Sequence, residues 1–167
     1  VGAFGVRTQL LGRQVMQVTA AIPQGAKAEE IFQGERAQVR FSDGSIVSLQ
    51  PGTRFRIDDY RFNADAQRGF YSLLRGSLRT LTGAIGKRTH DDYRLITPTA
   101  TVGVRGTEFV AEETVCEPEC RPGRSAGLRV AVTQGRVVVV NLSGATEVAA
   151  GAAVHVPSPS RPAEPTR

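Results

Sequence analysis

The feature that most constrains the fold is an alternation of apolar and polar residues between positions 36 and 58. Val39 and Phe41 alternate with polar neighbours, and the dipeptide Asp43-Gly44 follows them. Asp-Gly is typical of a two-residue hairpin turn, because these residues tolerate the positive φ that both central positions need. The stretch therefore predicts a β-hairpin with one face turned toward a core.

The chain keeps the same period after this turn. Val47 and Leu49 share one face of the returning strand, and Pro51-Gly52 marks a second turn. Beyond it, Phe55 and Ile57 alternate with charged residues. A period of two residues is typical of a half-buried strand, so a third strand is predicted here.

The last third of the chain shows turn signals at Gln134-Gly135, Ser143-Gly144 and Gly151, about eight residues apart. Regular turns of this kind predict an all-β fold of many short antiparallel strands, in a sandwich or a β-solenoid-like stack. The apolar run Val137–Val140 predicts a strand buried on both faces.

Both ends of the chain are less regular. The first 34 residues fit either a short amphipathic helix or two strands, and Gly12 with the β-branched residues after it favours strands. From Pro157 onward the chain contains four prolines and no apolar period. We therefore expect one β domain over residues 1–156, followed by a disordered tail or linker over residues 157–167.

Three polar segments interrupt the strand pattern and predict surface loops: residues 60–68, 83–92 and 116–126. Loops on a rigid scaffold are common binding surfaces. We expect a partner to bind through a sheet edge or through these loops.

One phase change falls between Val104 and Phe109. The two residues are five positions apart, so an unbroken strand would place them on opposite faces. One inserted residue restores the inward phase, and glycine tolerates the backbone that this requires. We therefore predict a bulge or sharp bend at Gly103 or Gly106.

The two cysteines, Cys116 and Cys120, are separated by a short segment that contains a proline. A disulfide between them is predicted, and it would indicate an oxidising compartment. A zinc site needs more ligands than two thiolates, and neither His90 nor His155 lies at a finger-like spacing from the pair. No metal and no cofactor are expected.

No group of residues forms a catalytic pattern. The segment 82–89 lacks the glycine and the hydroxyl residue that a phosphate-binding loop needs around its Gly-Lys. Thr89-His90-Asp91-Asp92, Asp58-Asp59 and Glu112-Glu113 are neighbours whose side chains diverge on an extended chain. No serine lies in a nucleophile elbow. We therefore expect that the protein is not an enzyme.

The net charge is +5, with 21 basic and 16 acidic residues. The arginines are scattered singly and never form a run, so nucleic acid is not expected as a partner. Exposed arginines do suit the carboxylates of an acidic glycan, which leaves that partner open. No apolar run approaches the roughly 18 residues of a transmembrane helix, so none is predicted.

Several motifs, in order, resemble the FecR-domain family: "VRFSDGSIVSLQPGTRFRIDDYRF", "LLRGSLRTLTGAIGKR", "TPTATVGVRGTEF" and "VAVTQGRVVVVN". The resemblance covers about residues 20–156, and in particular the secreted, stand-alone subgroup with a cysteine pair after the Arg-Gly-Thr motif. It implies an all-β domain in the periplasm of Gram-negative bacteria and supplies no catalytic residues. The motif residues expected to have structural roles are Asp43, Gly44, Gly103, Arg105, Gly106 and Thr107.

The namesake of that family is an inner-membrane regulator that passes a signal from an outer-membrane receptor to a sigma factor. This sequence contains neither its membrane helix nor its cytoplasmic segment, so we expect no sigma-factor control unless the chain is part of a longer protein. The resemblance leads us to expect a non-enzymatic, periplasmic or secreted binding and signalling module that contacts another cell-envelope protein. A polysaccharide- or peptidoglycan-binding module is the alternative.

Overall fold

The computed structural model describes residues 7–9, 14–18, 28–31, 37–89 and 91–166. In this part, thirteen strands and one turn of 3₁₀ helix, η1 (Ile85–Lys87), follow one another. The strands are β1 (Arg7–Gln9), β2 (Gln14–Val18), β3 (Ala28–Ile31), β4 (Ala37–Phe41), β5 (Ile46–Leu49), β6 (Arg54–Phe62), β7 (Gln67–Leu81), β8 (Tyr93–Ile96), β9 (Thr101–Thr114), β10 (Gly127–Asn141), β11 (Gly144–Ala149), β12 (Ala153–Val156) and β13 (Glu164–Thr166).

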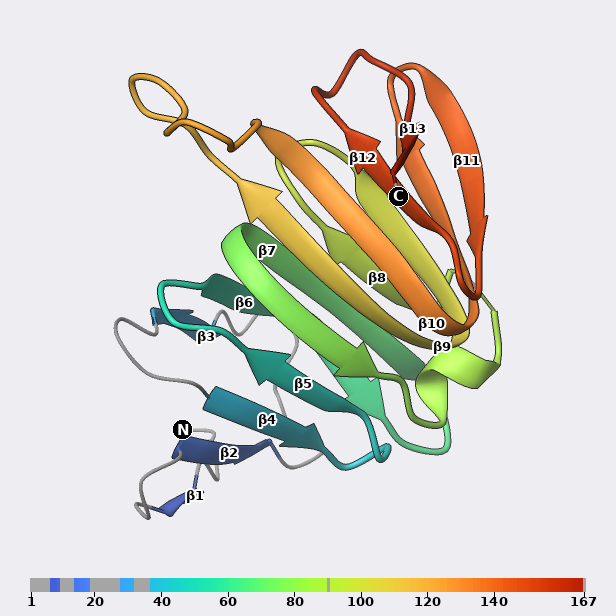
Figure 1. Cartoon of the computed structure of the whole chain (residues 1–167). Coiled ribbons are helices and arrows are strands. Elements are labelled where there is room, and N and C mark those ends of the chain that lie inside the picture. Colours follow the sequence, from blue (N-terminus) through green and yellow to red (C-terminus); the bar gives the residue numbers. More distant parts are fainter. Residues whose placement is uncertain (1–6, 10–13, 19–27, 32–36, 90, 167) are drawn as a thin grey trace.

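All thirteen strands belong to one hydrogen-bonded sheet (Figure 1). Neighbouring strands are antiparallel, except for β2 with β4 and β7 with β8, which are parallel. The predicted all-β class is confirmed. The strands are not all short, however, because β7 and β10 each contain 15 residues.

The sheet folds over on itself because its three longest strands change partners halfway. The first half of β7 pairs with β6 and β8, whereas its second half pairs with β5 and β9. The change falls at Gly76, whose φ is +96°. β9 and β10 change partners in the same way near Gly106 (φ +57°) and Gly135 (φ +78°). Strands that bend from one sheet into another form the corners of many β-sandwiches.

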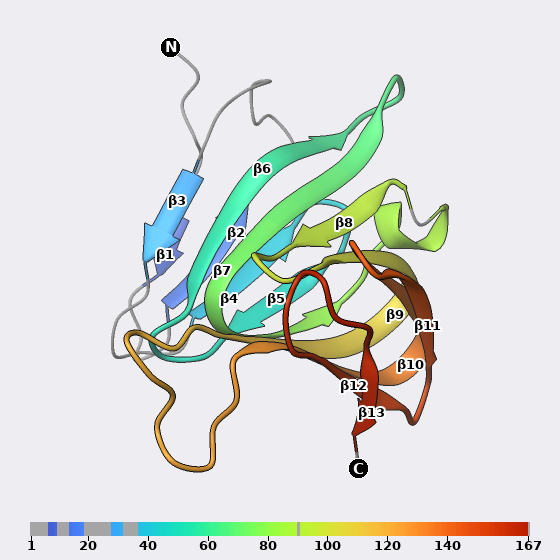
Figure 2. The same ribbon diagram turned by 90° about the horizontal axis from the view of Figure 1, so that it is seen from above.

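Two layers result, and Figure 2 shows the β6–β7 hairpin arching over β4 and β5. We call the layer of β6, β8, β11 and the adjoining halves of β7, β9 and β10 the first layer. The second layer contains β4, β5, β12 and the other halves of the three long strands. The core lies between them: the ring of Phe41 in β4 is 5.0 Å from that of Tyr60 in β6 and 5.1 Å from that of Tyr71 in β7.

The hairpin predicted around Asp43-Gly44 is confirmed, with Arg40 paired to Ile46. The expected turn type is wrong, since Gly44 (φ +90°) has positive φ and Asp43 does not. The turn is a wider one, closed by a bond from the Phe41 N–H to the Ser45 carbonyl (2.9 Å). The turn at Pro51-Gly52 is also present, and Phe55 and Ile57 are buried as expected.

The expected loop at 60–68 begins too early. β6 continues to Phe62, and Tyr60 within it is fully buried. The register of β6 against β7 shifts between Ile57 and Asp59, which moves the inward phase by one residue. This bulge broke the alternation in the sequence without ending the strand. Only residues 63–66 form the connecting turn.

Two expectations about β10 are corrected. Gln134-Gly135 lies inside the strand and not in a turn, because the positive φ of Gly135 serves the bend. Val137 and Val139 are buried, whereas Val140 is 45% exposed, so the valine run is covered on one face only. The turns near Ser143-Gly144 and Gly151 are present.

The chain ends also differ in part from expectation. β1 and β2 confirm strands within the first 34 residues, most of which lie outside the described part. After Pro157 we expected disorder, yet β13 pairs with β12 and the Leu142 N–H donates to the Pro159 carbonyl (2.9 Å). Proline is tolerated on an edge strand, where its missing N–H has no partner to lose, so β13 can include Pro165.

Candidate binding surface

Thr107 holds the bend of β9 together. Its hydroxyl lies 2.7 Å from the carbonyl of Arg136 and 2.9 Å from that of Arg105. Its N–H donates to the hydroxyl oxygen of Thr82 (2.8 Å), which in turn donates to the Thr107 carbonyl (3.0 Å). The register shift against β10 falls here, so the predicted bulge is confirmed at Gly106.

Arg105 is another motif residue of this bend. The residue is exposed, and within the described part of the chain its side chain makes no hydrogen bond or ion pair. It therefore does not bind carbonyls or a carboxylate across the bend. Gly103 lies in the regular first half of β9, opposite Arg94 and Val138.

Asp43 is a buried carboxylate that joins the hairpin to η1. One oxygen accepts the Ser45 N–H (3.0 Å), and the other accepts the Ser45 hydroxyl (2.7 Å) and the Ile85 N–H (3.3 Å). The carbonyl of Asp43 accepts the Ala84 N–H (2.9 Å). These hydrogen bonds to an ionised group hold the hairpin turn against η1.

The acidic residues considered for catalysis either lie apart from each other or form ion pairs with arginine. Asp58 lies 2.5 Å from the Arg56 guanidinium, and Asp59 lies 3.2 Å from that of Arg61. His90 lies outside the described residues. His155 Nε2 is 2.9 Å from the carbonyl of Ala126.

Glu113 is a buried acidic residue. The sequence did not distinguish it from its neighbour Glu112. It is only 3% exposed, and one of its oxygens accepts the Thr99 hydroxyl at 2.5 Å. The other oxygen is buried and has no hydrogen-bond partner in the part of the chain that the structure describes. Burial raises the pKa of Glu113, against the lowering effects of Thr99, Thr97 and His155. Its inward position follows from the bulge at Gly106, which sets the phase of the second half of β9.

Within the described part of the chain, no group of three or more His, Cys, Asp or Glu residues could hold a metal ion. The structure joins Cys116 to Cys120 by a disulfide, with the two α-carbons 4.6 Å apart. No helix in the described residues is long and apolar enough to span a membrane.

The three predicted contact loops do not form one surface. Residues 60–68 and Asp92, the last residue of the 83–92 segment, lie near the start of β7, where the Gly69 N–H donates to the Asp92 carbonyl (2.8 Å). The 116–126 loop lies beside the bend of β7, where Arg75 and Val115 border a groove. The 116–126 loop is therefore separate from the other two.

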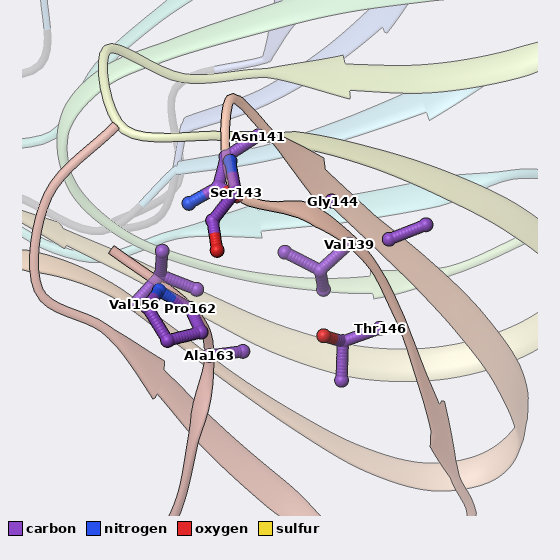
Figure 3. Close-up of a pocket in the computed structure, with 9 residues that line it drawn as sticks. Val139, Asn141, Ser143, Gly144, Thr146, Val156, Pro162 and Ala163 are labelled. Atoms are coloured by element: carbon purple, nitrogen blue, oxygen red, sulfur yellow. The ribbon is translucent and has the colours of Figure 1, made fainter. Parts of the chain in front are cut away.

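Figure 3 shows a cavity between β11 and the segment that follows β12. It is lined by Val139, Thr146, Val156, Pro162 and Ala163, among others, and its volume is about 50 Å³. Small-molecule sites usually measure about 300–1,000 Å³, so this cavity has room for a few water molecules and not for a cofactor.

The outer face of the first layer carries exposed apolar side chains next to an unpaired strand edge. Ile96, Val140 and Leu142 are 40%, 45% and 86% exposed. β11 borders this face and pairs only with β10 among the described strands. Apolar exposure beside an open edge is the feature of this structure that best suits contact with another protein.

The fold has counterparts among solved structures. Two crystal structures of a putative anti-sigma factor from Parabacteroides distasonis match it with TM-scores of 0.64 and 0.62, at 18% and 17% identity. Each match covers 85% of this chain and 60% or 59% of the solved chain. This chain therefore spans about three fifths of the length of those proteins. No curated protein matches the sequence.

The class defined by this fold is an all-β domain built from one folded-over sheet. The chain belongs to the FecR family, whose description is "FecR protein" and which matches residues 28–138. The matched region runs from β3 to the second half of β10, so it includes all three bends.

Proposed function

We propose that this chain is a non-enzymatic binding module of the bacterial cell envelope, periplasmic or secreted, which takes part in signalling by contacting another envelope protein. The membership of the FecR family carries the proposal. The disulfide between Cys116 and Cys120 supports the location, because disulfides form and persist in oxidising compartments.

The location is tested by thiol labelling of the producing cells. A maleimide reagent is added to cells opened in denaturant, with and without prior reduction. We expect Cys116 and Cys120 to react only after reduction, and the protein to leave the cells with the periplasmic or medium fraction. Free thiols in a cytoplasmic fraction would contradict the envelope location.

The binding role is tested separately, by crosslinking in intact cells followed by purification of the tagged chain. We expect a discrete adduct with one envelope protein. If the purified chain carries no protein adduct at any crosslinker length, the binding role is wrong.

An acidic glycan is the second candidate, favoured by arginines that make no ion pair in the described part of the chain. Arg105, Arg124 and Arg129 are such residues, and all three are exposed. Guanidinium groups pair well with carboxylates. Co-sedimentation with peptidoglycan sacculi at low salt would reveal this activity, and a soluble chain under those conditions would exclude it.

A further inference from the structure

β11 is an edge strand whose outer side is open. Its residues pair with β10 from Arg136↔Ala149 to Asn141↔Gly144, and none of the other described strands pairs with it. In Figure 1 it forms the border of the sheet on the side of the C-terminal strands. An open edge presents a row of unpaired N–H and C=O groups, to which another strand can bind.

The sequence of β11, GATEVA, lacks the devices that usually protect an edge. It contains no proline and no lysine. Its one charge, Glu147, already lies 3.1 Å from the guanidinium of Arg136. Proline and lysine commonly block edge strands. Because β11 contains neither, it can pair with another strand.

The outer face next to this edge is apolar at one end. Ile96 pairs with Thr101, Thr101 with Val140, and Val140 with Ala145, so these residues form one row across four strands. Leu142 lies in the turn that joins β10 to β11. The apolar end of the surface is therefore continuous with the edge strand.

The other end of the same surface is basic. Arg105 pairs with Arg136, and Arg136 with Ala149, in a parallel row. Arg136 has a single acidic neighbour, Glu147, and the side chain of Arg105 has none in the described part. The two arginines together have one neighbouring carboxylate, so this end of the surface favours an acidic group on whatever binds there.

The outward side chains of β11 leave both the apolar end and the basic end of this surface accessible. Ala145 and Ala149 point outward and are exposed, and each is short. Adjacent strands lie about 4.8 Å apart, so a long side chain on an added strand can reach over an alanine to the strand behind it. Over Ala145 it would meet Val140, and over Ala149 it would meet Arg136.

The inner side of β11 offers no alternative entry. Figure 3 shows Val139 and Thr146 facing Pro162 and Ala163, with only the small cavity between them. Asn141 donates from its amide to the carbonyls of Ser158 (3.3 Å) and Arg161 (2.6 Å), which holds this segment in place. Binding at this border therefore extends the sheet and does not insert between its layers.

From these features we propose that the partner binds by adding one β-strand to the outer edge of β11. The added strand carries an apolar residue opposite Ala145 and an acidic residue opposite Ala149. These two residues are four positions apart and share a face, because side chains alternate along a strand. The inference rests on the proposed protein-binding role and assigns its surface and the chemistry of its partner.

The test places a photo-crosslinking amino acid at position 145 of the full chain in the producing cells, and at Leu81 or Glu119 for comparison. We expect a protein adduct from position 145, whose crosslinked segment contains an apolar and an acidic residue four positions apart by mass spectrometry. Val140→Ser and Arg136→Gln should each reduce its yield about tenfold, as loss of a central contact does.

Leu81→Ser is the matched control, because Leu81 is 44% exposed, close to the exposure of Val140, and lies on the outer face of the second layer. Its adduct yield should equal that of the unchanged chain. Arg136 and Glu147 are both more than half exposed, so Arg136→Gln should leave folding intact by circular dichroism.

The outcomes separate the surface from the function. A protein adduct from position 81 or 119 but not from 145 overturns the assignment of β11 and leaves the binding role standing. An adduct with a second copy of this chain, or with glycan, also overturns it, as does a yield insensitive to both variants. Absence of any protein adduct from all three positions overturns the binding role as well.

Discussion

The carbonyl oxygen of Gly106 and the α-carbon of Gly135 meet where β9 and β10 bend together. A Cβ added at position 135 would lie 2.2 Å from that oxygen, whereas a Cβ at position 106 would meet nothing within 4 Å. Both glycines have positive φ. A side chain at position 135 is therefore opposed by the backbone conformation and by the collision with Gly106. At position 106 only the backbone conformation opposes it.

Gly106→Ala should lower the free energy of unfolding by about 1–2 kcal/mol, the cost of the left-handed conformation for a residue with a side chain. Gly135→Ala adds a collision with backbone and should cost about 4 kcal/mol or prevent folding. Urea denaturation followed by circular dichroism measures both. Equal losses in the two variants would show that the close approach does not matter.

Tyr60 and Tyr71 are both buried but differ in their hydroxyl groups. The Tyr60 hydroxyl accepts the Asp43 N–H (3.0 Å) and bonds to the Ser42 hydroxyl (2.8 Å), whereas the buried Tyr71 hydroxyl has no hydrogen-bond partner among the described residues. Tyr71→Phe should therefore raise the free energy of unfolding by about 1 kcal/mol, and Tyr60→Phe should lower it by about 1–2 kcal/mol. Losses of similar size in both variants would mean that the Tyr71 hydroxyl is hydrogen-bonded in solution.

Asp43→Asn tests the junction between the hairpin and η1. The carboxylate accepts three hydrogen bonds, and an amide nitrogen in place of one oxygen would face donors. We expect a loss of about 2–3 kcal/mol in the free energy of unfolding. Asp91→Asn is the control, because Asp91 is exposed beside Arg94 and should lose less than about 0.5 kcal/mol. If both variants are equally stable, the network contributes nothing.

Glu113 predicts a dependence of stability on pH. Burial raises its pKa in the folded protein above the ordinary 4.5, so the folded state binds this proton more tightly than the unfolded state. This contribution to stability is complete below pH 4.5 and is lost as the pH rises through the folded-state pKa. Glu113→Gln removes it, so the stability of the variant relative to the original chain should increase with pH.

Denaturation curves of the two proteins between pH 4 and pH 8 measure this difference. Other titrating groups are common to both proteins, so their effects largely cancel in the comparison. Parallel pH profiles would contradict a raised pKa at Glu113.

The disulfide should contribute locally to stability. It closes a loop of sequence separation 4, for which the chain-entropy relation gives about 2 kcal/mol. Replacing both Cys116 and Cys120 by serine should lower the free energy of unfolding by up to this amount. A reducing agent should destabilise the original chain and leave the double variant unchanged. Sensitivity of the variant to the reducing agent would point to another cause.

Local elements could be predicted where a sequence pattern is compatible with only one structure. Alternation around Val39 and Val47 predicted the hairpin, and the odd spacing of Val104 and Phe109 predicted the bulge. Gly135 was misread because a glycine with positive φ serves a turn and a bend equally well. The distinction depends on which strand pairs next, and the local sequence does not contain that information.

The candidate binding surface could not be predicted from the sequence for the same reason. We expected contacts through loops or a sheet edge, but which strand forms the edge depends on the order of strands in the sheet. Val140 belonged to an apolar run that predicted burial on both faces. It is exposed because none of the described segments covers the outer face of β10 and β11 there. A single sequence does not encode such an arrangement in any local pattern.

The three bends also determine how the domain unfolds. Because β7, β9 and β10 each contribute one half to either layer, neither layer contains a complete set of strands without the other. Loss of pairing in one layer removes the support of the same strands in the other. The two layers should therefore unfold in a single cooperative transition, without an intermediate in which one of them survives.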